Sequence, residues 1–127
     1  PLFSDQQFHN LGLSYYGRKH EDLGRYKITK DAADVGRFKT ASLREVARTA
    51  PYMHNGLIPS LDEVIQMYDA GMARPKPRKD QENDPLFPTT DPLLQKLSLT
   101  KEERAALKAF LLTLNSPAKR EKMPELP

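Results

Sequence analysis

Residues 49–56, with the sequence T-A-P-Y-M-H-N-G, bring the imidazole of His54 and the thioether of Met53 beside a turn at Gly56. Both side chains are groups that line or bind haem iron in proteins. The chain has no cysteine, however, so the C-x-x-C-H motif that attaches a c-type haem is absent from it. The sequence therefore contains a loop with the composition of a haem wall but no means of holding haem covalently.

Other kinds of catalytic or metal centre have no support in the sequence. Without cysteine, redox thiols and cysteine-rich zinc sites are excluded. His9, His20 and His54 are too far apart along the chain to form a zinc site on one helix. The chain also lacks the glycine-rich motifs that bind nucleotide phosphates and the G-x-S-x-G turn that carries a nucleophilic serine. We assign no catalytic residue to it.

Length and charge predict one globular domain, residues 1–127, that binds no nucleic acid. The chain is 38% hydrophobic, and its 20 basic and 17 acidic residues leave a net charge of +3. The basic run at residues 74–79 is followed at once by Asp80, Glu82 and Asp84, which is typical of a solvated loop. No apolar run approaches the roughly 18 residues of a membrane helix, and the first residues do not resemble a leader.

Three segments share the signature of a helix N-terminus, a hydroxyl residue followed three places later by Glu. These pairs are Ser42 with Glu45, Ser60 with Glu63, and Thr100 with Glu103. At this spacing the two side chains satisfy the first unpaired backbone amides of a helix. Three such capping boxes predict an all-α fold.

The second and third predicted helices each carry an apolar face. At about 100° per residue, the face of the second helix consists of Leu61, Val64, Ile65 and Tyr68. The face of the third consists of Leu107, Phe110, Leu111 and Leu114. We therefore expect Tyr68 to point inward, and we expect Gly71 to end the second helix.

The remaining segments are expected to lack regular structure. Residues 73–92 carry five prolines among many charges, which predicts a Pro-rich loop over the surface. Residues 117–127 are expected to form an extended tail. The first forty residues are expected to form loops and short turns, with a brief hairpin around residues 26–29.

Four stretches, in this order, resemble one protein family. They are F-S-D-Q-Q-F-H-N-L-G-L at residues 3–13, G-R-F-K-T-A-S-L-R-E-V-A-R-T-A-P-Y-M-H-N-G at 36–56, S-L-D-E-V-I-Q-M-Y-D-A-G at 60–71, and L-T-K-E-E-R-A-A-L-K-A-F-L-L-T-L at 99–114. Together they resemble the C-terminal, electron-transfer haem domain of the bacterial dihaem cytochrome c peroxidases, a family that includes the tryptophan-modifying MauG enzymes. The resemblance implies a cytochrome c-like helical domain with long loops. It also implies that this chain begins just after the C-x-x-C-H motif, so that its haem c is attached through polypeptide not shown.

The resemblance implies an axial ligand for the haem iron. In the family this ligand comes from the helix after the P-Y-x-H-x-G turn, and the matching position is Tyr68. Peroxidases of the family commonly have Met there, whereas MauG-like members have Tyr. Phenolate ligation stabilises ferric iron and lowers its potential, whereas thioether ligation raises it. Met67 and Met72 are the alternative ligands, and without the resemblance Tyr68 is a core tyrosine with a local hydrogen bond.

Other roles are carried over from the family in the same way. The resemblance implies a calcium ion between two haem domains, bound in part by the backbone carbonyls of Thr49 and Pro51. His54, His9 and Arg44 are expected near the haem edge or its propionates. The residues expected to pack against the haem are Phe38, Leu43 and Tyr52.

The resemblance implies a periplasmic oxidoreductase. The haem of this domain would accept electrons from a small redox protein and relay them to a peroxidatic haem in an N-terminal domain, where hydrogen peroxide is reduced to water. The chain alone is expected to be inactive, and the family also admits a homodimer. Three alternatives remain open: MauG-like oxidation of an aromatic residue in a partner protein, a simple c-type electron-transfer domain, and a haem-free interaction module.

Overall fold

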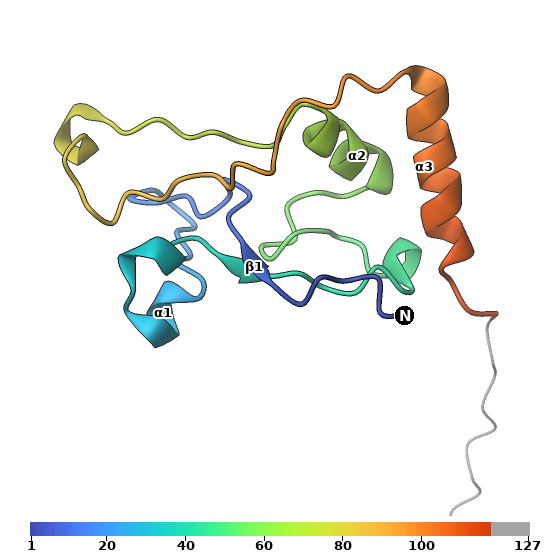
Figure 1. The fold of residues 1–127 in the computed structure, drawn as a ribbon, viewed down its shortest axis with the longest axis horizontal. Helices are drawn as coiled ribbons and strands as arrows, with labels where there is room; N and C mark the ends of the chain where they lie inside the picture. The colour runs from blue at the N-terminus through green and yellow to red at the C-terminus, as the bar shows by residue number, and fades with distance from the viewer. Residues whose placement is uncertain (118–127) are drawn as a thin grey trace, which may run out of the picture.

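The computed structural model describes residues 1–117, in which short elements are joined by long irregular segments (Figure 1). The helices of this range are α1 (Tyr26–Thr29), α2 (Leu61–Asp69) and α3 (Lys101–Thr113). Single 3-10 turns occupy Ala32–Asp34, Val46–Arg48 and Lys79–Gln81. Between residues 1 and 117 no helix is long and apolar enough to cross a lipid bilayer. Apart from its first residue, the tail expected at 117–127 lies outside the described range.

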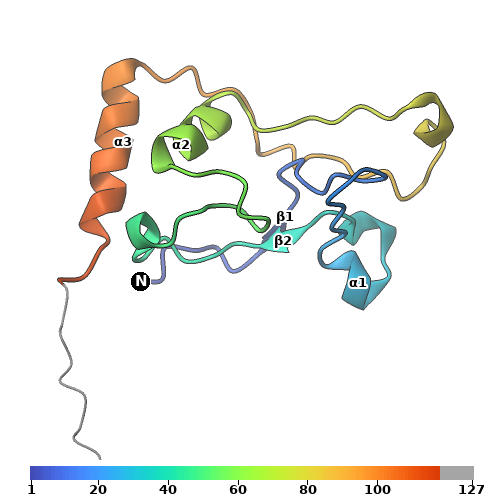
Figure 2. The same ribbon diagram turned by 180° about the vertical axis from the view of Figure 1, so that it is seen from behind.

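The all-α fold predicted from the sequence is wrong. Strands β1 (Phe8–His9) and β2 (Phe38–Lys39) pair antiparallel, with Phe8 opposite Lys39. Figure 2 shows this small sheet between α1 and the two longer helices. Each strand has only two residues, so neither leaves an alternating pattern in the sequence. The hairpin expected around residues 26–29 is also wrong, because these residues form α1.

The first capping box does not begin an α-helix. The Ser42 hydroxyl donates to the carbonyl of Leu2 at 2.5 Å, and the Glu45 carboxylate accepts from the backbone N–H of Ser116 at 2.6 Å. Glu45 itself has a left-handed backbone, with a φ of 60°. Both side chains therefore hydrogen-bond to distant segments instead of capping each other, and only the 3-10 turn Val46–Arg48 follows.

Helix α2 begins and ends as the sequence predicts. The Ser60 hydroxyl accepts a hydrogen bond from the backbone N–H of Glu63 at 3.3 Å, which caps the N-terminus. At the other end, Gly71 has a φ of 87°, a conformation in which a side chain is strained. The N–H of Met72 then donates to the carbonyl of Met67 at 2.8 Å, as in a Schellman motif. The positions of these two helix ends determine where Tyr68 lies.

The hydrophobic core lies between α2 and α3, which stand side by side in both ribbon views (Figures 1 and 2). Its buried residues are Leu61, Ile65, Leu111 and Leu114. The broader apolar face predicted for α3 is wrong, because Leu107 and Phe110 remain 38% and 48% exposed. Helix α3 lies at the edge of the fold and buries only a narrow stripe of side chains. The part of its apolar face that Leu107 and Phe110 form therefore stays in contact with solvent.

Residues 73–92 leave the helices, turn at the 3-10 segment Lys79–Gln81 and return (Figure 1, yellow). We call these residues the excursion. Its two limbs are joined where the Thr90 hydroxyl donates to the carbonyl of Ala73 at 2.7 Å. Near the turn, the Tyr16 hydroxyl donates to Asp84 at 2.6 Å. The excursion is therefore tied to the N-terminal third of the chain by specific hydrogen bonds.

Candidate functional site

Tyr68 lies in the last turn of α2, near the Gly71 end of the helix. It is 36% exposed, so it does not reach the centre of the core as its helical spacing predicts. The part of the ring that is covered still raises the pKa of Tyr68, and burial is the only cause of this shift. A free phenol at this position therefore keeps its proton at neutral pH.

The two alternative ligands differ in accessibility. Met67 precedes Tyr68 on α2 and is partly buried. Met72 follows Gly71 and is only 9% exposed, with a φ of 61°. A thioether must reach the iron directly, and of the two methionines Met67 is the more exposed residue.

Phe38 and His54 are predicted site residues that the fold brings together. Their rings stack with centroids 3.7 Å apart and planes 11° from parallel. Phe38 belongs to β2, whereas His54 belongs to the loop at residues 49–56, so the stack connects the sheet to that loop. Burial lowers the pKa of His54, which keeps its imidazole neutral near pH 7. The pair presents a flat, uncharged surface.

His9 and Arg44 already have partners elsewhere. The Nδ1 and Nε2 atoms of His9 lie 2.6 Å from Asp91 and 2.7 Å from Asp5. The Arg44 Nε donates to the carbonyl of Pro1 at 2.7 Å, and its guanidinium lies 5.3 Å from the centre of the Phe3 ring. Both ring nitrogens of His9 are thus engaged by carboxylates.

The remaining predicted residues lie around the same loop. Thr49 and Pro51 are exposed on either side of a cis peptide bond between Ala50 and Pro51. Tyr52 is partly buried against the α2–α3 core and pairs with Ile58 through a hydrogen bond of 2.7 Å from its N–H. Leu43, expected to pack against haem, is 38% exposed. Tyr52 thus holds the loop against α2. The exposed apolar side chain of Leu43 lies shortly before this loop in the sequence.

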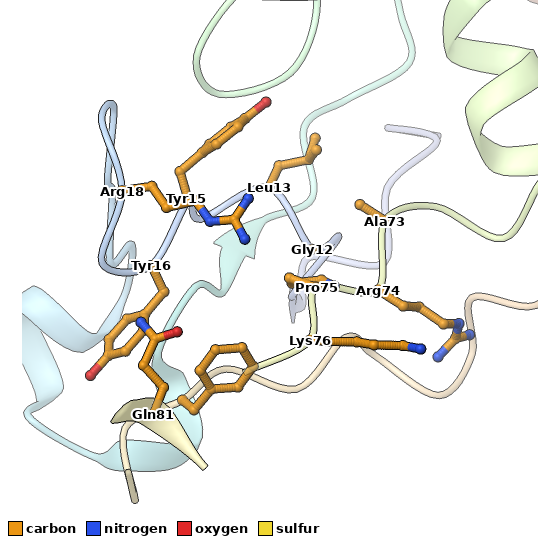
Figure 3. A pocket seen from close by; sticks show the side chains of 11 residues that line it. Gly12, Leu13, Tyr15, Tyr16, Arg18, Ala73, Arg74, Pro75, Lys76 and Gln81 are labelled. Atoms are coloured by element: carbon orange, nitrogen blue, oxygen red, sulfur yellow. The ribbon is translucent and has the colours of Figure 1, made fainter. Parts of the chain in front are cut away.

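Sequence reasoning missed a cavity of about 310 Å³ between residues 12–18 and the first limb of the excursion (Figure 3). None of the predicted site residues lines it. Its side chains include three cations and three aromatic rings: Arg18, Arg74, Lys76, Tyr15, Tyr16 and Phe87. The basic run at residues 74–79 is the signal that could have indicated it, but the acidic residues that follow made the run look like a solvated loop.

The donor groups at the end of α2 fit a haem iron. A haem needs only an axial ligand from such a chain, and the Tyr68 phenol and the Met67 thioether are both ligands of that kind. Within residues 1–117 no cluster of three His, Asp or Glu side chains could hold a metal ion directly. The flat Phe38–His54 stack and the exposed side chains of Leu43 and Leu57 supply apolar surface for a macrocycle. The residues present are therefore compatible with haem.

The chain is similar in sequence to several known proteins. No family model matches the chain. It is 35% identical to the cytochrome-c peroxidase IdrP1 of Denitromonas iodatirespirans over 91% of its length, and 41% identical to IdrP2 of Pseudomonas sp. strain SCT over 82%. It is also 33% identical over 98% of its length to the methylamine utilization protein MauG of Methylorubrum extorquens. The chain covers 35%, 24% and 31% of these three proteins, respectively.

A solved structure is similar to this chain in both fold and sequence. The crystal structure of a MauG-like protein associated with microbial copper homeostasis matches 89% of this chain with a TM-score of 0.70 and 36% sequence identity. The match covers 36% of that protein. Sequence and fold therefore agree over nearly all of the chain and over about a third of its relatives. The chain belongs to the family of dihaem cytochrome c peroxidases and MauG proteins.

Proposed function

We propose that this chain is the electron-transfer haem domain of a periplasmic dihaem peroxidase. In this reaction two electrons and two protons convert one molecule of hydrogen peroxide to two of water. The electrons come from a small redox protein and pass through the haem of this domain to a peroxidatic haem in an N-terminal domain. The observation that carries the proposal is the 35–41% identity to two cytochrome-c peroxidases over 82–91% of the chain.

In this function Tyr68 would hold the iron. Haem c, when bound, supplies the redox-active iron, and the chain supplies the ligand and its orientation. The caps of α2 at Ser60 and Gly71 fix the position of the phenol. Because burial raises the pKa of Tyr68, the free phenol is protonated, and only the charge of ferric iron would remove that proton. Met67 and Met72 are the alternatives if the phenol stays protonated.

The loop at residues 49–56 supports two further parts of the proposal. The carbonyls of Thr49 and Pro51 are on exposed residues, and calcium readily binds carbonyl oxygens, so these two would supply part of a calcium site. A neighbouring domain and water would complete the site. His54, stacked on Phe38, would contact the haem edge as a neutral ring. His9 and Arg44 are weaker candidates for propionate contacts because their polar atoms already have partners.

A second candidate function is the oxidation of an aromatic residue in a partner protein, as in MauG. Two observations favour it: the 33% identity to MauG over 98% of the chain, and a tyrosine at the position of the expected ligand. A phenolate ligand would hold the haem at low potential and favour storage of oxidising equivalents over electron uptake. A simple electron-transfer domain would need neither a peroxidatic haem nor a protein substrate.

The test uses the full-length protein loaded with haem. We expect Tyr68→Phe to lose the low-spin, six-coordinate signal of one haem in absorption and resonance Raman spectra. Tyr68→Met should restore six-coordination and raise the midpoint potential of that haem. Tyr26→Phe is the matched control, because Tyr26 lies on α1, away from the helix that carries the ligand. Wild-type turnover of hydrogen peroxide with a reduced donor protein tests the activity itself.

Two results would contradict the proposal in different ways. Unchanged spectra in Tyr68→Phe would move the ligand to Met67 or Met72 and leave the peroxidase activity open. Absence of peroxide turnover in a protein with two correctly ligated haems would exclude the peroxidase function. In that case, oxidation of a partner protein on addition of peroxide would support the MauG-like alternative.

A further inference from the structure

The cavity between residues 12–18 and the excursion has cations in its walls. In Figure 3 the guanidinium of Arg18 points into the space between Tyr15, Gly12 and Pro75. Lys76 lies on the opposite wall, which the first limb of the excursion forms, but its ammonium points away from Arg18. Arg74 also lines the wall, but it donates to the carbonyl of Leu94 and so is already engaged. Arg18 is therefore the cation that faces the space inside the cavity.

No carboxylate lines this cavity to neutralise its cations. None of the ion pairs between described residues includes Arg18 or Lys76. The acidic residues near its walls have other partners. Asp84 accepts from Tyr16 at 2.6 Å, and Glu21 accepts from the backbone N–H of Gly17 at 2.6 Å. The charged side chains that line the cavity are therefore all cations, which favours an anion there.

Gln81 adds an oriented hydrogen-bond donor. It is only 7% exposed, and its Oε1 atom accepts from the backbone N–H of Arg78 at 3.1 Å. That bond orients the amide and leaves Nε2 without a hydrogen bond to any residue in the described range. A Cβ atom at Gly17 would lie 2.6 Å from this Nε2, so the close approach depends on glycine. An oriented amide N–H that makes no such bond is available to donate to a bound acceptor.

We propose that this cavity binds the carboxylate of a small organic acid, with Arg18 as its cation and Gln81 as a neutral donor. Guanidinium groups bind carboxylates with two parallel hydrogen bonds. The rings of Tyr15 and Phe87 supply apolar wall for the body of the acid. A volume of about 310 Å³ is at the small end of ligand sites and has room for one ring with its carboxylate. The carboxylate comes either from a free acid or from a haem propionate of the same protein, and the second source rests on the function proposed above.

The first arm of the test titrates benzoate into the haem-loaded, full-length protein by calorimetry. For a free acid we expect saturable binding that weakens with salt, at least about tenfold weaker binding in Arg18→Gln, and none with benzamide, the neutral analogue. Lys19→Gln is the matched control, because Lys19 is exposed, adjacent in sequence and absent from the cavity wall. It should change affinity less than about twofold. Circular dichroism of each variant checks that it is folded.

The second arm follows the haem midpoint potential against pH in wild-type protein and Arg18→Gln. If a propionate fills the cavity, benzoate will not bind, and loss of the cation will move the pH dependence of the potential to higher pH, because an unpaired carboxylate is a weaker acid. Lys19→Gln should leave the curve unchanged. The proposal is overturned if benzoate fails to bind and the curve of Arg18→Gln matches that of wild type. Benzoate binding does not depend on peroxide turnover, so the two proposals can fail separately.

Discussion

The Nδ1 atom of His9 lies 2.6 Å from the Oδ2 atom of Asp91, across 82 positions of the chain. This contact joins β1 to the returning limb of the excursion. On the other side of the ring, Nε2 lies 2.7 Å from Asp5. The hydrogen bond with Asp91, followed by that with Asp5, raises the pKa of His9, so the ring is most stable as an imidazolium between two carboxylates.

The His9 contact should make the returning limb of the excursion more stable in mild acid than in base. The folded pKa of His9 lies above its unfolded value of about 6.5, so its contribution is complete below that pH and is lost as pH rises through the raised pKa. The pKa values of Asp91 and Asp5 are lowered, that of Asp5 to about 2. The stability that these two carboxylates contribute therefore has the opposite pH dependence and is lost only in strong acid. We expect amide exchange in residues 85–95 to slow as pH falls from 9 to 5.5, after correction for intrinsic rates.

His9→Gln provides the comparison for this pH effect. The variant should exchange faster than wild type at pH 5.5, and the difference should shrink towards pH 9, where the imidazolium has lost its proton. His20→Gln is the control, since His20 is exposed and makes no contact with Asp5 or Asp91. A difference of the same size at both pH values would mean that His9 acts by packing rather than by charge.

Tyr16 should anchor the turn of the excursion through its hydroxyl. The bond to Asp84 raises the pKa of Tyr16 to about 12, so the phenol donates over the whole physiological range. Tyr16→Phe keeps the edge-to-face contact with Phe87, at 5.8 Å between centroids, and removes only the hydrogen bond. We expect several-fold faster exchange in residues 79–87. Asp84→Asn should return the pKa of Tyr16 towards 10 in an ultraviolet titration.

The three capping boxes show how far local sequence predicts this fold. The pairs at Ser60 and Thr100 begin helices because the side chains of each pair cap its helix, without another hydrogen-bond partner in residues 1–117, and an apolar face follows. The pair at Ser42 has the same letters, but its members bond to Leu2 and Ser116. Contacts 40 and 71 positions away cannot be detected in a four-residue motif. Tertiary hydrogen bonds therefore decided which boxes became helices.

The candidate site was predictable where residues share one element or one loop. Spacing on α2 places Tyr68 near a helix end beside Met67, and the loop at residues 49–56 keeps His54 close to the sheet. The engagement of His9 with Asp91 and the cavity around Arg18 depend on the path of the excursion. That path is set by bonds between segments far apart in sequence, which composition and spacing do not encode.

Leu111 should contribute more to stability than its neighbour Leu112. Leu111 is 8% exposed and packs with Leu61 and Ile65, whereas Leu112 is 47% exposed on the same helix. Truncation of a buried leucine costs about 2–5 kcal/mol, from lost burial and the cavity that remains. We therefore expect Leu111→Ala to lower the free energy of unfolding by about that amount in urea titrations of the full-length protein. Leu112→Ala, with the same helix propensities, should cost less than about 1 kcal/mol.

Gly12 should tolerate no side chain, because the excursion leaves the helices directly against it. Its φ is 77°, and a Cβ atom there would lie 2.0 Å from the carbonyl oxygen of Ala73. That neighbour is backbone and cannot rotate away, so Gly12→Ala must displace the start of the excursion. At Gly56, with a φ of 65°, the nearest atom is Cγ of Pro51 at 3.3 Å, and this contact can yield. Gly56→Ala should cost about 1–2 kcal/mol from backbone strain alone, whereas Gly12→Ala should cost more. Equal melting temperatures for the two variants would show that the approach of Ala73 to Gly12 is not maintained in solution.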